Sequence, residues 1–260
     1  MNSPPVLILG GTAEARSLAE QLVEAGLSVT SSLAGRVADP ALPLGAVRIG
    51  GFGGPAGLED YVRRNGVAVV VDATHPFATT MSTSAISACA ASSLPLLRLT
   101  RPGWQQPPGA RSWRWVDTYA DAAEAARDLG TRIFLTTGRT TLQSFTALSD
   151  LFVLVRLVDA ANRPLPIRWD VIRARGPYTV DGETRLMTSN GIDVLITKDS
   201  GGAMTAPKLA AADKLGVSTV VVRRPMVADA ADLAQVCTVD QAVRWVLRQV
   251  EMHGAARASG

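Results

Sequence analysis

Residues 6–16 read VLILGGTAEAR, and this stretch decides the fold class. Its first four residues are apolar and predict a short strand, which a pair of glycines ends immediately before a helical pattern over residues 13–25. A second apolar run follows at residues 28–33. A strand, a glycine turn, a helix and another strand form the β-α-β unit from which parallel sheets are built.

The same alternation of short apolar runs and alanine-rich helical patterns continues through most of the 260 residues. It predicts an α/β protein with two Rossmann-like three-layer domains, each a mainly parallel sheet covered by helices. Residues 101–111, RPGWQQPPGAR, interrupt the pattern with three prolines and two glycines and are typical of a linker. We therefore expect a cofactor-binding domain at residues 1–100 and a substrate-binding domain at residues 112–253, although the chain ends could cross from one domain to the other.

The composition is that of a compact protein and excludes several classes of function. Hydrophobic residues make up 47% and charged residues 19%, which suits a packed core and argues against disorder. The net charge is +3 and the basic residues are dispersed, so nucleic-acid binding is not expected. No apolar run approaches the ~18 residues of a membrane span, and the start does not resemble a signal peptide. We expect a cytoplasmic protein.

Several chemical signatures are absent from the sequence. Cys89 and Cys237 each stand alone, without the Cys or His neighbours of a zinc site, so no metal site is predicted. There is no GxSxG elbow, no GxxxxGK[ST] loop and no tyrosine followed four residues later by lysine. These absences argue against a serine hydrolase, a P-loop enzyme and a short-chain dehydrogenase with a Tyr/Lys proton relay.

The turn after the first strand has the placement of a phosphate-binding loop. Glycines allow the backbone to approach a phosphate, and the following helix start offers unpaired N–H groups and partial positive charge. The turn reads G-G-T-A-E-A and so departs from GxGxxG; an ordinary tight turn is the alternative interpretation. We assign Gly10, Gly11, Thr12 and Glu14 to cofactor binding.

The end of the second strand favours NADPH over NADH. A site for NADH usually places an acidic residue there to hold the ribose 2′-hydroxyl. Residues 30–36 read TSSLAGR and contain no acid. Ser32 and Arg36 could instead contact a 2′-phosphate, since a guanidinium pairs well with phosphate.

Two further loops are expected at the same edge of the sheet. Gly51 and Gly53 belong to the run GGFGG after the third strand, and glycine suits close approach to a flat ligand. Thr74 and His75 belong to DATHPF after the fourth strand, at the carboxyl edge where open α/β sheets bind ligands. We assign Gly51, Gly53 and Thr74 to the cofactor and treat His75 as a candidate catalytic residue.

Polar motifs follow three strands of the second half and predict a site for an anionic substrate. Hydroxyls, glycine N–H groups and cations at strand ends suit several carboxylates or phosphates. The residues assigned to this substrate site are Thr137, Arg139, Lys198, Ser200, Gly201 and Arg223, with Lys198 also a candidate catalytic residue.

An ordered set of short motifs resembles the precorrin-6A reductase family of cobalamin biosynthesis. The motifs are ILGGTAEAR at 8–16, AGR at 34–36, DATHPFA at 72–78, LRLTRPGW at 97–104, TTGR at 136–139 and ITKDSGG at 196–202. The resemblance implies NADPH as hydride donor and reduction of one double bond of the precorrin-6A macrocycle to give precorrin-6B. It also implies an anionic tetrapyrrole substrate with many acetate and propionate groups. Related proteins of the anaerobic route act on the cobalt-containing counterpart, and the sequence does not separate the two.

The mechanism suggested by these residues is direct hydride transfer to a conjugated C=N/C=C system. The proton for the reduced macrocycle could come from His75, Lys198 or solvent. Two other functions remain open: an NADPH-dependent reductase of another small anionic substrate, and a non-catalytic NADPH-binding module. We expect a monomer or a weak homodimer, without membrane or nucleic-acid partners.

Overall fold

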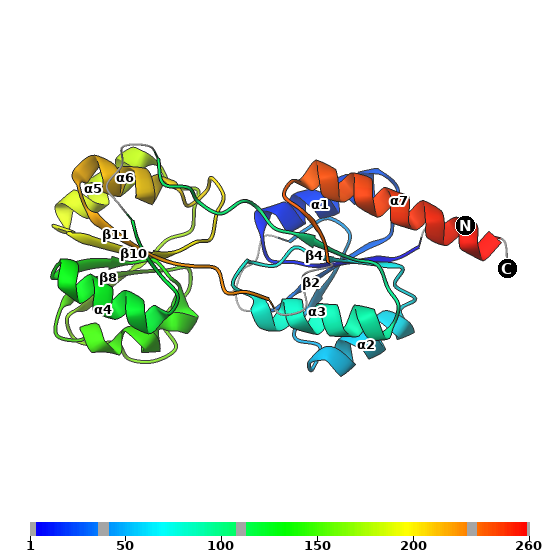
Figure 1. Ribbon diagram of the computed structural model, residues 1–260, viewed down its shortest axis with the longest axis horizontal. Coiled ribbons are helices and arrows are strands. Elements are labelled where there is room, and N and C mark those ends of the chain that lie inside the picture. The colour runs from blue at the N-terminus through cyan, green and yellow to red at the C-terminus, as the bar shows by residue number, and fades with distance from the viewer. Residues whose placement is uncertain (1–3, 36–41, 108–112, 228–232, 259–260) are drawn as a thin grey trace. The chain divides into compact units, whose positions relative to one another are not determined.

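The computed structural model describes residues 4–35, 42–107, 113–227 and 233–258, with side chains up to residue 254 (Figure 1). The chain divides into two compact units. Unit 1 comprises residues 1–101 and 226–260, and unit 2 comprises residues 102–225. The predicted α/β class is confirmed, and every strand pairing is parallel.

Unit 1 contains a six-stranded sheet with the order β12-β5-β4-β1-β2-β3. Its strands are β1 (Val6–Leu9), β2 (Val29–Leu33), β3 (Ala46–Ile49), β4 (Val69–Asp72), β5 (Leu96–Leu99) and β12 (Ala234–Val236). Its helices are α1 (Ala13–Glu24), α2 (Pro55–Arg64), α3 (Thr79–Ala91) and α7 (Val239–Ala258). Helices α1 and α7 cover one face of the sheet, and α2 and α3 cover the other (Figure 1).

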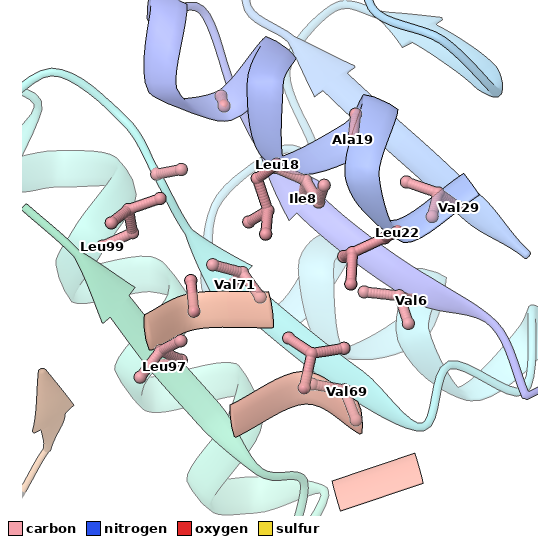
Figure 2. Close-up of a cluster of buried hydrophobic side chains, with 14 of the residues drawn as sticks. Val6, Ile8, Leu18, Ala19, Leu22, Val29, Val69, Val71, Leu97 and Leu99 are labelled. Atoms are coloured by element: carbon pink, nitrogen blue, oxygen red, sulfur yellow. The ribbon is translucent and has the colours of Figure 1, made fainter. Parts of the chain in front are cut away.

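Alternation along the strands divides the core of unit 1 between the two faces. Val6 and Ile8 of β1 pack against Leu18 and Leu22 of α1 (Figure 2). Leu7 of β1 faces the opposite side, toward α2 and α3. Because both faces are covered, β1 is continuously apolar rather than alternating. Each fully buried aliphatic side chain contributes roughly 1.5–3 kcal/mol, so this central strand fixes the position of the turn that follows it.

Unit 2 repeats the arrangement with the order β6-β11-β10-β7-β8-β9. Its strands are β6 (Arg114–Val116), β7 (Arg132–Leu135), β8 (Phe152–Leu157), β9 (Trp169–Arg173), β10 (Val194–Lys198) and β11 (Ser218–Val222). Its helices are α4 (Tyr119–Leu129), the 3-10 helix η1 (Arg139–Leu148), α5 (Val180–Ser189) and α6 (Pro207–Leu215). Helices α5 and α6 lie on one face, whereas α4 and η1 lie on the other (Figure 1).

The chain crosses between the units twice, and this differs from the expected boundaries. The domain expected at residues 112–253 lacks its last part, because β12 pairs with β5 and α7 packs on α1 in unit 1. Of the expected linker, residues 102–107 belong to unit 2, and residues 108–111 lie outside the described ranges. The β6–α4 and β12–α7 segments have the same local strand-helix pattern, so periodicity does not reveal which sheet each one joins.

Sequence patterning missed two elements of unit 2 and mistook the type of another. Strand β9 lies at the sheet edge and is mostly exposed, so it lacks the apolar run that marks a buried strand. Helix α5 begins at the Thr179 cap but carries Gly182 in its first turn, which weakens the helical signal. The sequence pattern of residues 141–148 predicts a helix, and the segment is a 3-10 helix that begins at Arg139.

Candidate functional site

Each sheet has one topological switch point, where neighbouring strands connect in opposite directions. In unit 1 it lies between β1 and β4, and in unit 2 it lies between β7 and β10. Ligands of open α/β sheets bind at the carboxyl ends of such strands. Four of the loops that the sequence assigned to ligands follow these strands, and the other assigned residues lie at or after the ends of β2, β3 and β11. The topology therefore brings the predicted residues to one edge of each sheet.

The turn after β1 is held in a shape that leaves space beside Gly11. The Gly10 N–H donates to the Ser32 carbonyl at 2.9 Å, which ties the turn to the end of β2. Gly11 has φ +112°, and a Cβ there would meet no atom within 4 Å. The positive φ favours glycine, and the open space allows a ligand to approach the backbone directly.

Thr12 caps α1 and links two loops. Its Oγ1 accepts a hydrogen bond from Ala15 N at 3.1 Å and donates one to the Ala73 carbonyl at 2.8 Å. The side chain is buried. The hydroxyl, which the sequence assigned to a ligand, is therefore used to join the turn after β1 to the turn after β4.

Glu14 forms an ion pair with Arg101, a residue that the sequence analysis left without a role. Arg101 Nη1 lies 2.8 Å from Glu14 Oε2, and both side chains are partly buried. A small surface hollow beside the pair is lined by Thr12, Glu14, Thr74, Pro76, Leu99, Thr100 and Arg101. This arginine belongs to the motif LRLTRPGW. Its place directly after the strand β5 is the feature of the sequence that marks it as a candidate site residue.

The end of β2 is organised by Arg48, which was also missed. Arg48 Nη1 donates to Ser32 Oγ at 3.0 Å and to the Gly50 carbonyl at 2.8 Å, and Nη2 donates to the Gly51 carbonyl at 2.9 Å. Its guanidinium lies 3.8 Å from the centroid of the Phe52 ring. Ser32 and Gly51 are thus brought together, while Gly53 follows with φ +83°. Arg36 lies outside the described residues.

The loop after β4 is stabilised by Asp72. Its Oδ1 accepts hydrogen bonds from Thr74 N at 3.1 Å and Thr74 Oγ1 at 2.7 Å, and its Oδ2 accepts one from Ser82 Oγ at 2.5 Å. His75 Nδ1 accepts a hydrogen bond from Phe77 N at 3.2 Å, so a neutral His75 carries its proton on Nε2.

Cys89 of α3 is an inert core residue. Burial raises the pKa of its thiol to about 12, and the negative charge of Asp72 adds to the increase.

In unit 2, the loop after β7 presents backbone rather than hydroxyls. Thr137 is fully buried, and its Oγ1 lies 2.8 Å from Thr141 Oγ1. Gly138 has φ +98°, a Cβ added there would meet no atom within 4 Å, and Arg139 follows it at the start of η1. The Thr137 hydroxyl is thus engaged by that of Thr141, and its contact with a substrate stays a prediction. Arg139 is only partly buried at the sheet edge.

The loop after β10 contains the other predicted substrate residues. Lys198 and Ser200 are partly buried, and Gly201 has φ +65°. Arg223, after β11, lies 3.6 Å from Asp117 and is half exposed. An open hollow of about 370 Å³ next to it is lined by Trp115, Asp199, Arg223 and Arg224.

Comparison with known proteins identifies the family. The family model described as precorrin-6x reductase CbiJ/CobK matches residues 5–247. The precorrin-6A reductase of Rhodococcus erythropolis is 47% identical over 93% of this chain and 96% of its own length. That of Mycobacterium tuberculosis is 46% identical over the same shares. The chain belongs to the CbiJ/CobK reductase family. This confirms the predicted family and the prediction of an oxidoreductase.

A solved structure agrees with the family. A structure described as CobK precorrin-6A reductase superposes with a TM-score of 0.88 at 39% identity, covering 95% of this reductase and 97% of the other chain. The cobalt-precorrin-6A reductase of Priestia megaterium is less similar, at 33% identity over 85% of this chain and 91% of its own length. Membership of the family implies a reduced nicotinamide cofactor.

The turn after β1 of this reductase fits a dinucleotide phosphate. The first N–H groups of α1 have no partners within the helix, and the Thr12 cap uses only that of Ala15. The space beside Gly11 is open, since a Cβ added there would meet no atom within 4 Å. The remaining N–H groups and the helix dipole favour a phosphate at this point, and Arg101 offsets the charge of Glu14 in the first turn of α1.

Beneath the loops of unit 2, the reductase buries a group of charges that sequence reasoning missed. Arg156 Nη2 lies 2.7 Å from Glu183 Oε1, and both side chains are buried. Lys208 is buried as well; its Nζ donates to the Thr205 carbonyl at 2.8 Å and lies 4.5 Å from the Trp104 ring centroid. Burial, followed by the charge of Arg156, lowers the pKa of Lys208 to about 7. The structure thus favours a readily deprotonated amine there.

Two absences hold for the described part of the chain. No group of three His, Cys, Asp or Glu side chains there could hold a metal ion. No helix there is both long and apolar enough to cross a membrane.

Proposed function

We propose that this reductase uses NADPH to reduce one double bond of precorrin-6A, giving precorrin-6B. The observation that carries the proposal is the match to precorrin-6A reductases, at 46–47% identity over 93% of the chain. The metal-free substrate is favoured because the cobalt-precorrin-6A reductases of Priestia megaterium and Salmonella typhimurium are less similar, at 33% and 29% identity. The cobalt-containing macrocycle is therefore an outcome of the test rather than a second proposal.

The cofactor binds unit 1 at the switch point between β1 and β4. The turn at Gly10 and Gly11 holds the pyrophosphate through main-chain N–H groups, and Arg101 neutralises Glu14 beside it. Ser32, Gly51 and Gly53 lie near the ends of β2 and β3, where the adenosine ribose of a Rossmann cofactor is placed. Arg36 pairs with the 2′-phosphate, as the acid-free sequence TSSLAGR indicates.

The macrocycle binds the edge of unit 2 through its carboxylates. Arg139, Lys198 and Arg223 supply cations, and Ser200 and Gly201 supply polar groups of the loop after β10. The Lys198 side chain is partly buried, and the attraction between an ammonium group and a carboxylate is stronger there than in bulk water. His75 in unit 1 remains the other candidate proton donor, through Nε2–H.

The bound dihydronicotinamide supplies the hydride, and the chain supplies position and a proton. Fixed N–H groups and cations orient both reactants without reorganising during the reaction. Nothing in this scheme needs a nucleophilic side chain, which agrees with an inert Cys89.

Turnover tests the proposal directly. Purified protein is mixed with NADPH and precorrin-6A, and loss of dihydronicotinamide absorbance is followed together with the product mass. We expect NADPH oxidation with formation of a product heavier by two hydrogens. Turnover of the cobalt form alone would change the substrate, and NADPH binding without oxidation by either macrocycle would contradict a reductase function.

A further inference from the structure

The carboxylate of Asp199 joins three segments of unit 2. Its Oδ1 accepts a hydrogen bond from Trp104 N at 2.8 Å, and its Oδ2 lies 3.1 Å from Arg224 Nε. Arg224 Nε also donates to the Asp199 carbonyl at 3.0 Å. Asp199 itself is only 8% exposed. An ionised carboxylate is stable at such a depth only when it is paired and hydrogen-bonded, and here both oxygens have partners.

Two of the three segments that Asp199 joins are the ends of unit 2. The chain enters unit 2 after Arg101 and leaves it at Pro225. Trp104 lies just after the entry, and Arg224 lies just before the exit. The third segment is the loop 198–202, which carries Asp199 between the proposed substrate residues Lys198 and Ser200.

Additional contacts hold the same loop against the entering segment. Trp104 Nε1 donates to the Gly202 carbonyl at 3.1 Å, and Lys208 Nζ lies over the Trp104 ring. The packing against Asp199 is tight: a Cβ added to Gly103 would lie 2.5 Å from Asp199 Oδ2. A glycine is therefore required at position 103 for the carboxylate to keep its place.

We propose that Asp199 is a positioning residue that fixes the loop 198–202 to both ends of unit 2 and so holds Lys198 and Ser200 in place for the substrate. This inference rests on the proposed function, because that function makes the loop a substrate site. Asp199 lines the open hollow beside Arg223, but both of its carboxylate oxygens already have partners within unit 2. It acts through the loop, since both of its oxygens face Trp104 and Arg224.

Two variants break this arrangement from opposite sides. Asp199→Asn keeps an oxygen for Trp104 N but loses the charge that pairs with Arg224. Gly103→Ala keeps Asp199 and pushes its carboxylate away. Asp128→Asn is the matched control, because it removes a carboxylate of unit 2 whose pair with Arg114 is exposed at the surface.

Hydrogen–deuterium exchange of the full-length protein without ligand, read by mass spectrometry, measures the loop itself. A hydrogen bond to a charged group is worth enough to speed local exchange roughly 10- to 100-fold when it is lost. We expect this acceleration in peptides covering residues 102–104 and 198–205 of Asp199→Asn and Gly103→Ala, with unit 1 and Asp128→Asn unchanged. Unchanged exchange in these peptides, or equal acceleration along the whole chain, would overturn the inference.

Steady-state kinetics with precorrin-6A then separate positioning from general destabilisation. We expect the KM for the macrocycle to rise roughly tenfold or more in both variants, while the KM for NADPH stays at the wild-type value. Equal increases in both KM values would contradict a positioning role. Should the wild-type protein fail to oxidise NADPH with the macrocycle, the proposed function fails, whereas the exchange pattern still decides whether Asp199 fixes the loop.

Discussion

Arg101 and Glu14 form a 2.8 Å ion pair that joins the end of β5 to the first turn of α1. Glu14 is well placed for the helix dipole but opposes any phosphate bound at the same helix start. The pair resolves this conflict, because Arg101 neutralises the carboxylate and leaves the N–H groups of the turn available. Both residues line the hollow beside Thr12 and Thr74.

Removing the arginine should therefore weaken cofactor binding more than removing the acid. We expect Arg101→Met to raise the KM for NADPH about tenfold, a loss of ~1.4 kcal/mol, because it leaves Glu14 unpaired beside the phosphate. The double variant Glu14→Gln/Arg101→Met should recover most of the lost affinity. Steady-state titration of NADPH measures both, and a double variant no better than Arg101→Met would show that the charge of Glu14 is irrelevant.

Gly11 should be sensitive to a single added methyl group. Its φ of +112° is costly for any other residue, by about 1–2 kcal/mol, and a Cβ would enter the space proposed for the phosphate. We expect Gly11→Ala to lower the melting temperature slightly and to raise the KM for NADPH at least tenfold.

Gly26 provides the matched control for Gly11. It also has a positive φ and open space around it, but it lies at the opposite end of α1. Gly26→Ala should cost similar stability without changing the KM for NADPH. Equal effects of the two variants on cofactor affinity would argue against a phosphate at Gly11.

Lys208 should make stability depend on pH. Burial lowers its pKa from 10.5 to about 7, so the unfolded chain holds a proton that the folded chain releases between these values. The destabilising contribution of Lys208 is therefore complete below pH 7 and is relieved as the pH rises from about 7 to 10. Lys208→Met should be more stable than wild type by roughly 1–4 kcal/mol in acid, with the difference shrinking in base.

Thermal unfolding of wild type and Lys208→Met across this pH range checks the direction in which their stability difference changes. Lys214→Met, on the exposed side of the same helix, should follow the wild-type profile. A Lys208→Met difference that grows with pH would mean that the buried amine is charged and stabilising in the folded protein.

Local patterns predicted the residues of the central strands and the turns after them, but not the distant pairings. The run VLIL and the glycines that follow it specify β1 and its turn through short-range effects alone. The roles of Arg48, Arg101, Asp199 and Lys208 depend on partners supplied by the tertiary fold, and an isolated arginine or lysine in a sequence does not reveal such a partner. The sequence left a crossover of the chain ends open, but it could not show that β12 and α7 return to unit 1, since a strand followed by a helix can join either sheet.

Arg36 should control the choice between the two nicotinamide cofactors. Because only NADPH carries a 2′-phosphate, Arg36→Ala should raise the KM for NADPH far more than the KM for NADH. Arg48→Met is the informative comparison. Arg48 donates hydrogen bonds to the Gly50 and Gly51 carbonyls, so its loss should raise the KM for NADPH and the KM for NADH together. Equal effects of Arg36→Ala on the two cofactors would refute a contact with the 2′-phosphate.

The most direct measurement follows the hydrogen itself. Precorrin-6A is incubated with the protein and with NADPH carrying deuterium at the transferable position of its nicotinamide ring, and the product is weighed by mass spectrometry. Direct hydride transfer predicts one deuterium in each product molecule, with none at that carbon when the label is in the solvent instead. A product that carries no deuterium from the cofactor would contradict direct hydride transfer from NADPH.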